Sequence, residues 1–316
     1  MTRKVSARRA GLGAVVWLVA VAWRVPNAWH GAWAQALLLF AALVLVPLAW
    51  PLILGGTPGA LLRAAGRLQW PAAVVLAVGI WWPRGFVAVA LALPWIAVTA
   101  LLAASGAVEF WRERPRAAAA RCRLAALLFI AIGGVWLAAD RVGFRPLGFS
   151  EDIVVLTAVH FHYAGLVLPL VTSAAVRELP GAWSGRLAVV GVIVGVPLVA
   201  VGITTAQLHM LPGLEAVAAV WLGLTGWLVA GLHWRLAGEA RWRWGARVGW
   251  AVAGVSLAFG MSLAMLYGAR GYFHPLPWLD LPWMRALHGT ANAVGFAFCA
   301  LLAWRGARTP QSGGRG

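Results

Sequence analysis

The sequence predicts an all-α, polytopic transmembrane helix bundle with about ten spans and both termini cytoplasmic. Composition gives the first reason. Hydrophobic residues make up 62% of the 316 residues and charged residues only 11%, whereas soluble domains are about 45–50% apolar and about a quarter charged. Long apolar runs give the second, because residues 87–108 and 153–176 reach the length of about 20 residues that crosses a bilayer. A water-soluble fold is therefore excluded.

Apolar runs, and the Arg, Pro and Gly residues between them, divide the chain into ten predicted spans. They cover residues 11–25, 32–54, 68–83, 85–108, 122–140, 152–176, 186–208, 213–235, 246–268 and 285–305. The first and third spans are short, at about 15 residues against about 20 for a full crossing, so they could be tilted, re-entrant or merged with a neighbouring span. Residues 1–306 form one predicted transmembrane domain, and residues 307–316 a short, disordered cytoplasmic tail.

The basic residues set the predicted orientation. With ten spans and a cytoplasmic N-terminus, 20 of the 26 Lys and Arg residues fall on inner segments, as the positive-inside rule expects. The other six, on outer segments, are Arg24, Arg84, Arg141, Arg145, Arg270 and Arg285. The net charge of +17 thus reflects membrane topology. A nucleic-acid-binding domain would instead carry a basic stripe with interleaved aromatic residues, so the predicted partner is the lipid bilayer and not nucleic acid.

Polar side chains interrupt the sixth predicted span, in the stretch AVHFHYAGLVLPL at residues 158–170. His160, His162 and Tyr163 lie inside this apolar run, and Glu151 and Asp152 open the span from the predicted outer side. At about 1.5 Å per residue, His160 lies about 12 Å deeper than Asp152. A polar group turned to lipid would cost several kcal/mol. We therefore expect these side chains to face protein or water.

Helical phase separates the two histidines of this span. His160 and His162 lie about 200° apart around the helix axis, so they cannot bind one ion from one face. Glu151 and His162 are eleven residues apart and differ by only about 20°. Asp152 and Tyr163 have the same relation. The sixth span therefore carries a predicted polar stripe that runs inward from its acidic start.

The tenth predicted span carries a second polar stripe, because His288 and Asn292 are neighbours one helical turn apart. His209 ends the seventh span at the same predicted outer side. We predict that the sixth and tenth spans meet in the outer half of the membrane, where Gly165 and Gly295 would allow close backbone approach.

These residues form the predicted substrate or proton site. Its members are His160, His162, Tyr163, His288, Asn292, Glu151, Asp152 and His209. Each also has a purely structural interpretation. A single intramembrane histidine often only bridges two helices by a hydrogen bond, and an acidic pair at a helix start is favoured by the helix dipole.

Two stretches resemble the YndJ-like family of bacterial multi-pass membrane proteins. They are LTAVHFHYAGLVLPL at residues 156–170 and HGTANAVGF at residues 288–296, so the resemblance lies mainly in the second half of the chain. It implies a bacterial plasma-membrane protein, of a family sometimes labelled as transporters, with longer members that carry further C-terminal sequence. The family motif positions that it carries over are His160, His162, Tyr163, Gly165, His288, Gly289, Asn292 and Gly295.

Transport of a small solute or ion, with protons handled by histidine, is the first functional hypothesis. Imidazole titrates near neutral pH, so histidines in a hydrated vestibule could couple solute movement to proton movement. Gly and Pro interrupt several spans, for example at Gly165 and Pro169, and could break helices around a midplane site. Gly and Pro are also common in ordinary membrane helices.

A membrane-embedded metal or haem enzyme is the alternative. His160, His162, His209 and His288 are the candidate metal ligands, with Glu151, Asp152 or Glu215 as a possible acidic ligand. A haem could be held between His160 and His288. The chain contains no HExxH or CxxCH motif, so no definite cofactor is implied. A sensor or assembly partner without turnover is a third interpretation, and the sequence leaves enzymatic activity open. Nucleotide-driven chemistry is disfavoured, because the chain contains no GxxxxGK[ST] motif.

Overall fold

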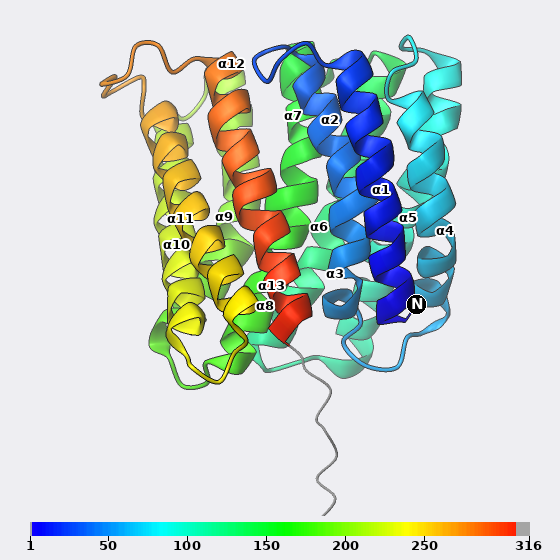
Figure 1. Cartoon of the computed structure of the whole chain (residues 1–316). Coiled ribbons are helices and arrows are strands. Elements are labelled where there is room, and N and C mark those ends of the chain that lie inside the picture. The colour runs from blue at the N-terminus through cyan, green and yellow to red at the C-terminus, as the bar shows by residue number, and fades with distance from the viewer. Residues whose placement is uncertain (1, 308–316) are drawn as a thin grey trace, which may run out of the picture.

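The computed structural model describes residues 2–307 as a bundle of ten helical rods (Figure 1). Consecutive rods alternate in direction, and residues 2–307 contain no strand, which confirms the predicted all-α polytopic bundle. The rods are α1 (Arg3–Arg24); α2, η1 and α3 (Ala32–Phe40, Ala41–Leu45, Val46–Ile53); α4 (Ala60–Gly79); α5 (Phe86–Glu113); α6 (Ala118–Val142), followed by the 3-10 turn η2 (Pro146–Gly148); α7, η3 and α8 (Glu151–His162, Tyr163–Val167, Leu168–Glu178); α9 (Trp183–Gln207); α10 (Leu214–Gly238); α11 (Trp244–Gly268); and α12, η4, η5 and α13 (Leu281–Trp283, Met284–Gly289, Ala291–Phe298, Cys299–Ala307). The segments η1, η3, η4 and η5 are π-helical.

Nine of the rods within residues 2–307 are long and apolar enough to cross a membrane. The exception is α4, whose mean hydropathy is lowered by Arg63, Arg67 and Gln69 in its first half. It still runs antiparallel to its neighbours α3 and α5, so the alternation that the ten-span prediction requires is kept (Figure 1).

The predicted starts of the first and third spans were wrong. α1 begins at Arg3, and α4 begins at Ala60, well before residue 68. Apolar segmentation stops at the first arginine, but a helix continues past it when the guanidinium finds an acceptor. Arg63 Nη1 donates to the carbonyl oxygen of Pro58 at 2.6 Å, and Arg9 Nη1 donates to that of Gly66 at 2.8 Å. At the other terminus α13 ends at Ala307, and the rest of the predicted tail lies outside the described residues.

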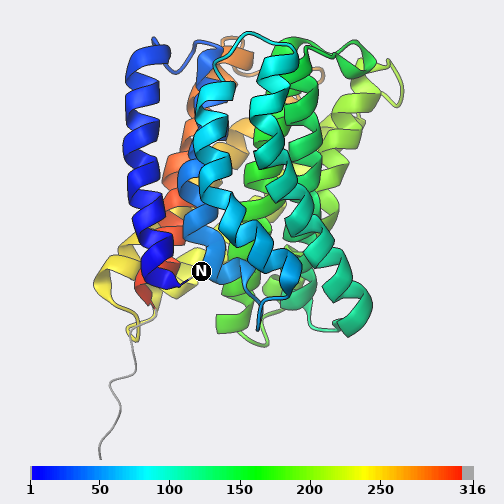
Figure 2. The ribbon, with the colours of Figure 1, turned by 90° about the vertical axis from the view of Figure 1, so that its right-hand side faces the viewer.

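The second rod, built from α2, η1 and α3, runs through the centre of the bundle. In its most apolar stretch 94% of the residues are buried, against 17% for α1. α1 lies at the edge of the bundle, as Figure 2 shows. A helix that is apolar on all sides is stable where other helices surround it, because no side has to face a polar environment.

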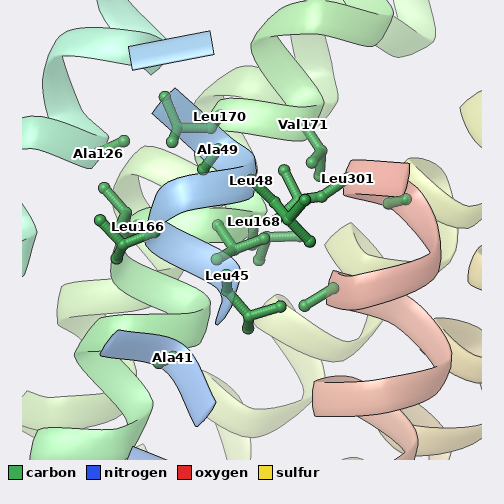
Figure 3. Close-up of a cluster of buried hydrophobic side chains, with 14 of the residues drawn as sticks. Ala41, Leu45, Leu48, Ala49, Ala126, Leu166, Leu168, Leu170, Val171 and Leu301 are labelled. Atoms are coloured by element: carbon green, nitrogen blue, oxygen red, sulfur yellow. The ribbon is translucent and has the colours of Figure 1, made fainter. Parts of the chain in front are cut away.

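Leucine and alanine side chains of the central rod form part of the hydrophobic core of the bundle. Leu45, Leu48 and Ala49 lie among side chains of α8, η3 and α13, including Leu168 and Leu301 (Figure 3). Leu45 and Ala49 are fully buried, and Leu168 and Leu301 are nearly so. Close packing of this kind fixes the helices around the site with few internal voids.

Three π-helical segments, η3, η4 and η5, lie on the two rods that carry the histidine motifs. A π turn holds an extra residue per turn and is frequent at functional sites. The two rods do contact each other through η3 and η5. The predicted role of the glycines was wrong, however. A Cβ on Gly165 would meet Phe129 of α6 at 3.3 Å, and one on Gly295 would meet Ser256 of α11 at 2.2 Å, so each allows close approach to a different helix.

The two ends of the bundle differ in charge. We call them the α12 end, where α7 and α12 begin, and the α13 end, where α13 stops (Figure 1). The six arginines that the sequence places on outer segments all lie at the α12 end, and the other described basic residues lie at the α13 end. The positive-inside rule thus assigns the α13 end to the cytoplasm, and this orientation stays a prediction.

Candidate functional site

A cavity of about 530 Å³ lies between α7, α9, α10, α11 and the last rod. It begins at the α12 end, near the close of α9 and the start of α10, and reaches inward to the middle of the bundle. Its polar lining residues are Thr157, His160, Tyr163, Thr204, Gln207, Glu215, Tyr267, Arg270, Arg285, His288 and Asn292. The deeper wall is apolar and includes Leu168, Leu222, Leu257 and Phe296.

His160 lies in the cavity wall. Its ring packs edge-on against Phe161 with the ring centroids 5.3 Å apart. Its Nε2 atom is buried and has no hydrogen-bond partner within the described part of the chain. A buried nitrogen without a partner costs free energy, so His160 retains hydrogen-bonding capacity for a bound molecule or water.

His162 lies on the opposite side of α7, away from the cavity. Trp95 of α5 donates its indole N–H to Nε2 at 3.0 Å, and Nδ1 lies 2.8 Å from the carbonyl oxygen of Ala158. Nε2 must therefore be an acceptor and Nδ1 the donor, which defines a neutral tautomer with both nitrogens satisfied. The ring is fully buried, and a Cβ at Gly133 of α6 would lie only 2.8 Å from Nδ1. The structure thus makes His162 a packing residue between α5, α6 and α7.

His288 and Asn292 lie together on the last rod. Nδ1 of His288 lies 2.7 Å from the carbonyl oxygen of Gly260 in α11, and Asn292 Nδ2 donates to the carbonyl oxygen of His288 at 3.0 Å. Asn292 Oδ1 is buried and has no partner among residues 2–307. A Cβ at position 260 would lie 2.5 Å from Asn292 Nδ2, so a larger residue there would displace the Asn292 side chain. This pair presents imidazole and amide groups to the cavity across from His160.

Tyr163 lines the cavity at the start of η3. Its hydroxyl donates to the carbonyl oxygen of Leu37 in α2 at 2.8 Å. The phenol therefore ties the π turn to the central rod, and its ring forms part of the cavity wall.

Glu151 lies at the surface of the α12 end and outside the cavity lining. It forms ion pairs with Arg84 and Arg145. Arg84 also pairs with the buried Asp140 at 3.1 Å. Partial burial lowers the pKa of Arg84, but hydrogen bonds and charge attraction from both carboxylates outweigh it and raise the pKa above the usual value. Glu151 is thus part of a surface ion-pair network.

Asp152 lies beside the cavity without lining it. Its Oδ2 lies 3.5 Å from Nη1 of Arg285, which lines the cavity. His209 lies elsewhere, exposed in the turn after α9 with a left-handed backbone (φ 54°). The structure therefore brings His160, Tyr163, His288 and Asn292 to one cavity, with Asp152 at its edge, and places His162, Glu151 and His209 outside it.

Two arginines of the lining escaped the sequence-based prediction of the site. Arg285 precedes His288 and Asn292 at helical spacing on the same rod, and this pattern could have identified it. Arg270 Nη1 donates to Glu215 Oε1 at 2.8 Å, which joins the end of α11 to the start of α10. That contact crosses 55 residues of sequence, and no local pattern predicts it.

The candidate metal ligands do not converge. Of His160, His162, His209 and His288, only His160 and His288 reach the cavity. Across residues 2–307 no group of three or more His, Cys, Asp or Glu residues is placed to hold a metal ion. A metal site of the usual donor number is therefore not preformed in the described chain.

Comparison with known proteins agrees with the motif resemblance and extends it. The family described as "YndJ-like protein" matches residues 36–296. The chain belongs to the YndJ-like family. The match includes most of the first half, so the expectation that the resemblance lies mainly in the second half was too narrow. The family match, together with the apolar rods within residues 2–307, makes this YndJ-like chain a multi-pass bacterial membrane protein.

A relative from Bacillus subtilis (strain 168), named "Uncharacterized membrane protein YndJ", is 28% identical over 287 residues. The aligned region covers 86% of this YndJ-like chain but only 48% of the relative, so the chain spans about half of the relative's length. No solved structure matches the chain.

Proposed function

We propose that this protein is a transporter of a small solute or ion and that the cavity is its substrate site. The observation that carries the proposal is the cavity itself. Membrane-protein cores pack closely, and voids much larger than a water molecule are rare. A volume of about 530 Å³ instead falls in the range of about 300–1,000 Å³ typical of ligand sites. His160, His288 and Asn292 give its wall the few polar groups that orient a ligand.

Polar groups beyond the cavity floor support a path across the membrane. Phe296 lines the floor, and its ring packs edge-on against His233 of α10, with the centroids 5.8 Å apart. His233 is fully buried. Within residues 2–307, its Nε2 and the indole nitrogens of Trp250 and Trp304 have no hydrogen-bond partner. One aromatic ring thus separates the cavity from further polar groups toward the α13 end.

The π-helical segments support a wall that can rearrange. Tyr163, His288 and Asn292 all lie on π turns. A π turn and an α turn differ by one residue of register, so a change between them would rotate these side chains relative to the cavity. Alternating access requires such discrete rearrangements around a fixed site.

Cysteine labelling from each side of the membrane tests the proposal. Cys122 and Cys299 are first replaced by alanine, and Ala164, which lines the cavity, is changed to cysteine. A charged, membrane-impermeant methanethiosulfonate is then added to right-side-out and to inverted vesicles. A transporter is expected to react from both sides, because its site opens to each in turn. Ala158→Cys is the matched control on the same rod, since Ala158 is fully buried and should react from neither side.

Reaction from the α12 end only would contradict transport and indicate a receptor-like binding cavity. Absence of reaction from either side would mean that water does not reach the cavity, and the proposed site would be wrong.

A further inference from the structure

Positively charged residues outnumber negatively charged ones in the cavity wall. Among the described lining residues, Arg270 and Arg285 are cationic and Glu215 is the one acid. Glu215 is committed to Arg270 at 2.8 Å. The remaining lining charge is therefore the guanidinium of Arg285, on the same face of the last rod as His288.

Arg285 is buried, with 4% of its surface exposed. Nη2 donates to the carbonyl oxygen of Trp29 in the turn before α2. Nε and Nη1 have no hydrogen-bond partner in the described chain, although Asp152 Oδ2 lies 3.5 Å from Nη1. Asp152 itself is half-exposed. A guanidinium presents five N–H donors in a planar fork that fits carboxylate and phosphate groups, so most of the donor capacity of Arg285 is unused.

Apolar side chains form one part of the wall away from Arg285. Leu222 of α10, Leu257 and Met261 of α11, and Phe296 of the last rod supply it. Water held against such a surface is readily displaced by an apolar group, because burying apolar area is favourable. The cavity thus presents one cationic group near the α12 end and an apolar surface deeper in the bundle.

We infer that the cavity binds an amphipathic organic anion, whose single carboxylate or phosphate group pairs with Arg285 and whose apolar body lies between α10, α11 and the last rod. Asp152 forms a weak ion pair with the guanidinium when this ligand is absent, and the anionic group of the ligand replaces Asp152 when it binds. The inference rests on the proposed function, since it takes the cavity as the substrate site and names the class of substrate.

A structural role for Arg285 is the competing explanation. In that case the guanidinium only ties the start of α2 to the start of α7 through Trp29 and Asp152. The two explanations differ for Asp152→Asn. If a ligand anion competes with Asp152, removing that carboxylate strengthens binding. If Arg285 is only a tie, the same change lowers stability and leaves ligand affinity unchanged.

Calorimetric titration of the full chain in phosphatidylcholine nanodiscs tests the inference. The probe is octanoate, and octanamide is the matched neutral compound. We expect saturable octanoate binding, at least tenfold weaker binding of octanamide, and at least tenfold weaker octanoate binding by Arg285→Gln. Arg285→Lys should recover part of the loss, because it keeps the charge. Arg145→Gln is the control, since Arg145 is exposed at the same end of the bundle and should bind like the parent.

Asp152→Asn should bind octanoate at least threefold more tightly, and this variant keeps the test decisive if Arg285→Gln does not fold. The source of the anion is distinguished in nanodiscs that contain phosphatidylglycerol. Competition of phosphatidylglycerol with octanoate in the parent would identify a lipid headgroup as the anion, and absence of competition would identify a free organic anion.

Equal binding of octanoate and octanamide, or unchanged octanoate affinity in both Arg285→Gln and Asp152→Asn, would overturn the inference. This result leaves two-sided labelling of Ala164→Cys untouched, so the anion inference and the transporter proposal fail separately. Conversely, octanoate binding through Arg285 with one-sided labelling would support the anion site and contradict transport.

Discussion

The two sides of α7 use histidine in opposite ways. His162 faces α5 and α6, where Trp95 and a backbone carbonyl satisfy both ring nitrogens. His160, two residues earlier, faces the cavity, and its Nε2 has no partner among residues 2–307. Both residues are histidines, and they lie at nearly the same depth in the bundle. What distinguishes a structural histidine from a candidate site residue is whether its neighbours complete its hydrogen bonds.

The same contrast extends to the charged groups at the α12 end. Arg141 is fully buried, yet it donates to the carbonyl oxygen of Ile80 at 2.7 Å and to Asp140 Oδ2 at 2.7 Å. It therefore caps the end of α4. Arg285 is buried almost as deeply in the cavity wall, but two of its three nitrogens have no hydrogen-bond partner in the described chain. Completed networks on the α4–α7 side should thus govern stability, and incomplete ones in the cavity should govern binding.

Arg141 should give the largest effect on stability. Arg141→Met removes the cap of α4 and leaves Asp140 with Arg84 alone, and breaking a buried ion pair costs about 3–5 kcal/mol. The free energy of unfolding in detergent, measured by denaturant titration, is the readout. Arg145→Met is the control, because Arg145 is exposed and a surface pair contributes about 0–1 kcal/mol. Equal losses in the two variants would contradict a special role for Arg141.

The two histidines of α7 give the next largest difference. His162→Ala removes a fully buried ring and leaves the Trp95 indole N–H unpaired, so we expect a loss of about 3 kcal/mol in the free energy of unfolding. His160→Ala should cost less, about 1–2 kcal/mol, because Nε2 has no partner to lose and the change removes only the ring packing on Phe161 and one hydrogen bond with the backbone of Val196. Comparable losses in the two variants, measured by the same titration, would mean that His160 is also a packing residue.

Trp95→Phe tests the hydrogen bond to His162 with the ring retained. It leaves Nε2 of His162 buried and unpaired, which costs about 1–3 kcal/mol. Octanoate affinity should stay that of the parent, since Trp95 lies on the far side of α7 from the cavity. A change in affinity without a loss of thermal stability would show that the two sides of α7 are not independent.

Tyr163→Phe should give the smallest measurable effect. It removes one hydrogen bond, to the carbonyl oxygen of Leu37, and keeps the ring that lines the cavity, so a loss of about 1 kcal/mol is expected. Tyr272→Phe is the matched control, because Tyr272 is 70% exposed. Thermal unfolding of both variants checks the difference, and identical melting temperatures would show that the Tyr163 hydroxyl does not tie η3 to α2.

The sequence by itself determined the membrane class and the number of rods. Hydropathy and length depend on composition alone, because a bilayer imposes the same requirement on every span. The position of each arginine also predicted which end of the bundle it occupies, since a span of known direction leaves little freedom. The start of α4 was missed because Arg63 finds a backbone acceptor, which hydropathy does not measure.

Only the tertiary structure decided which polar groups face the cavity. Helical phase placed His160 and His162 on opposite sides of α7, but both sides are covered by other helices, and sequence does not say which neighbour supplies a donor. Trp95 satisfies His162 from 67 residues away, and Asp152 meets Arg285 across two rods. Contacts of this range depend on how the rods pack, and so the cavity, the contact of Arg285 with Asp152 and the separation of His162 from the cavity follow from the packing and from no local pattern.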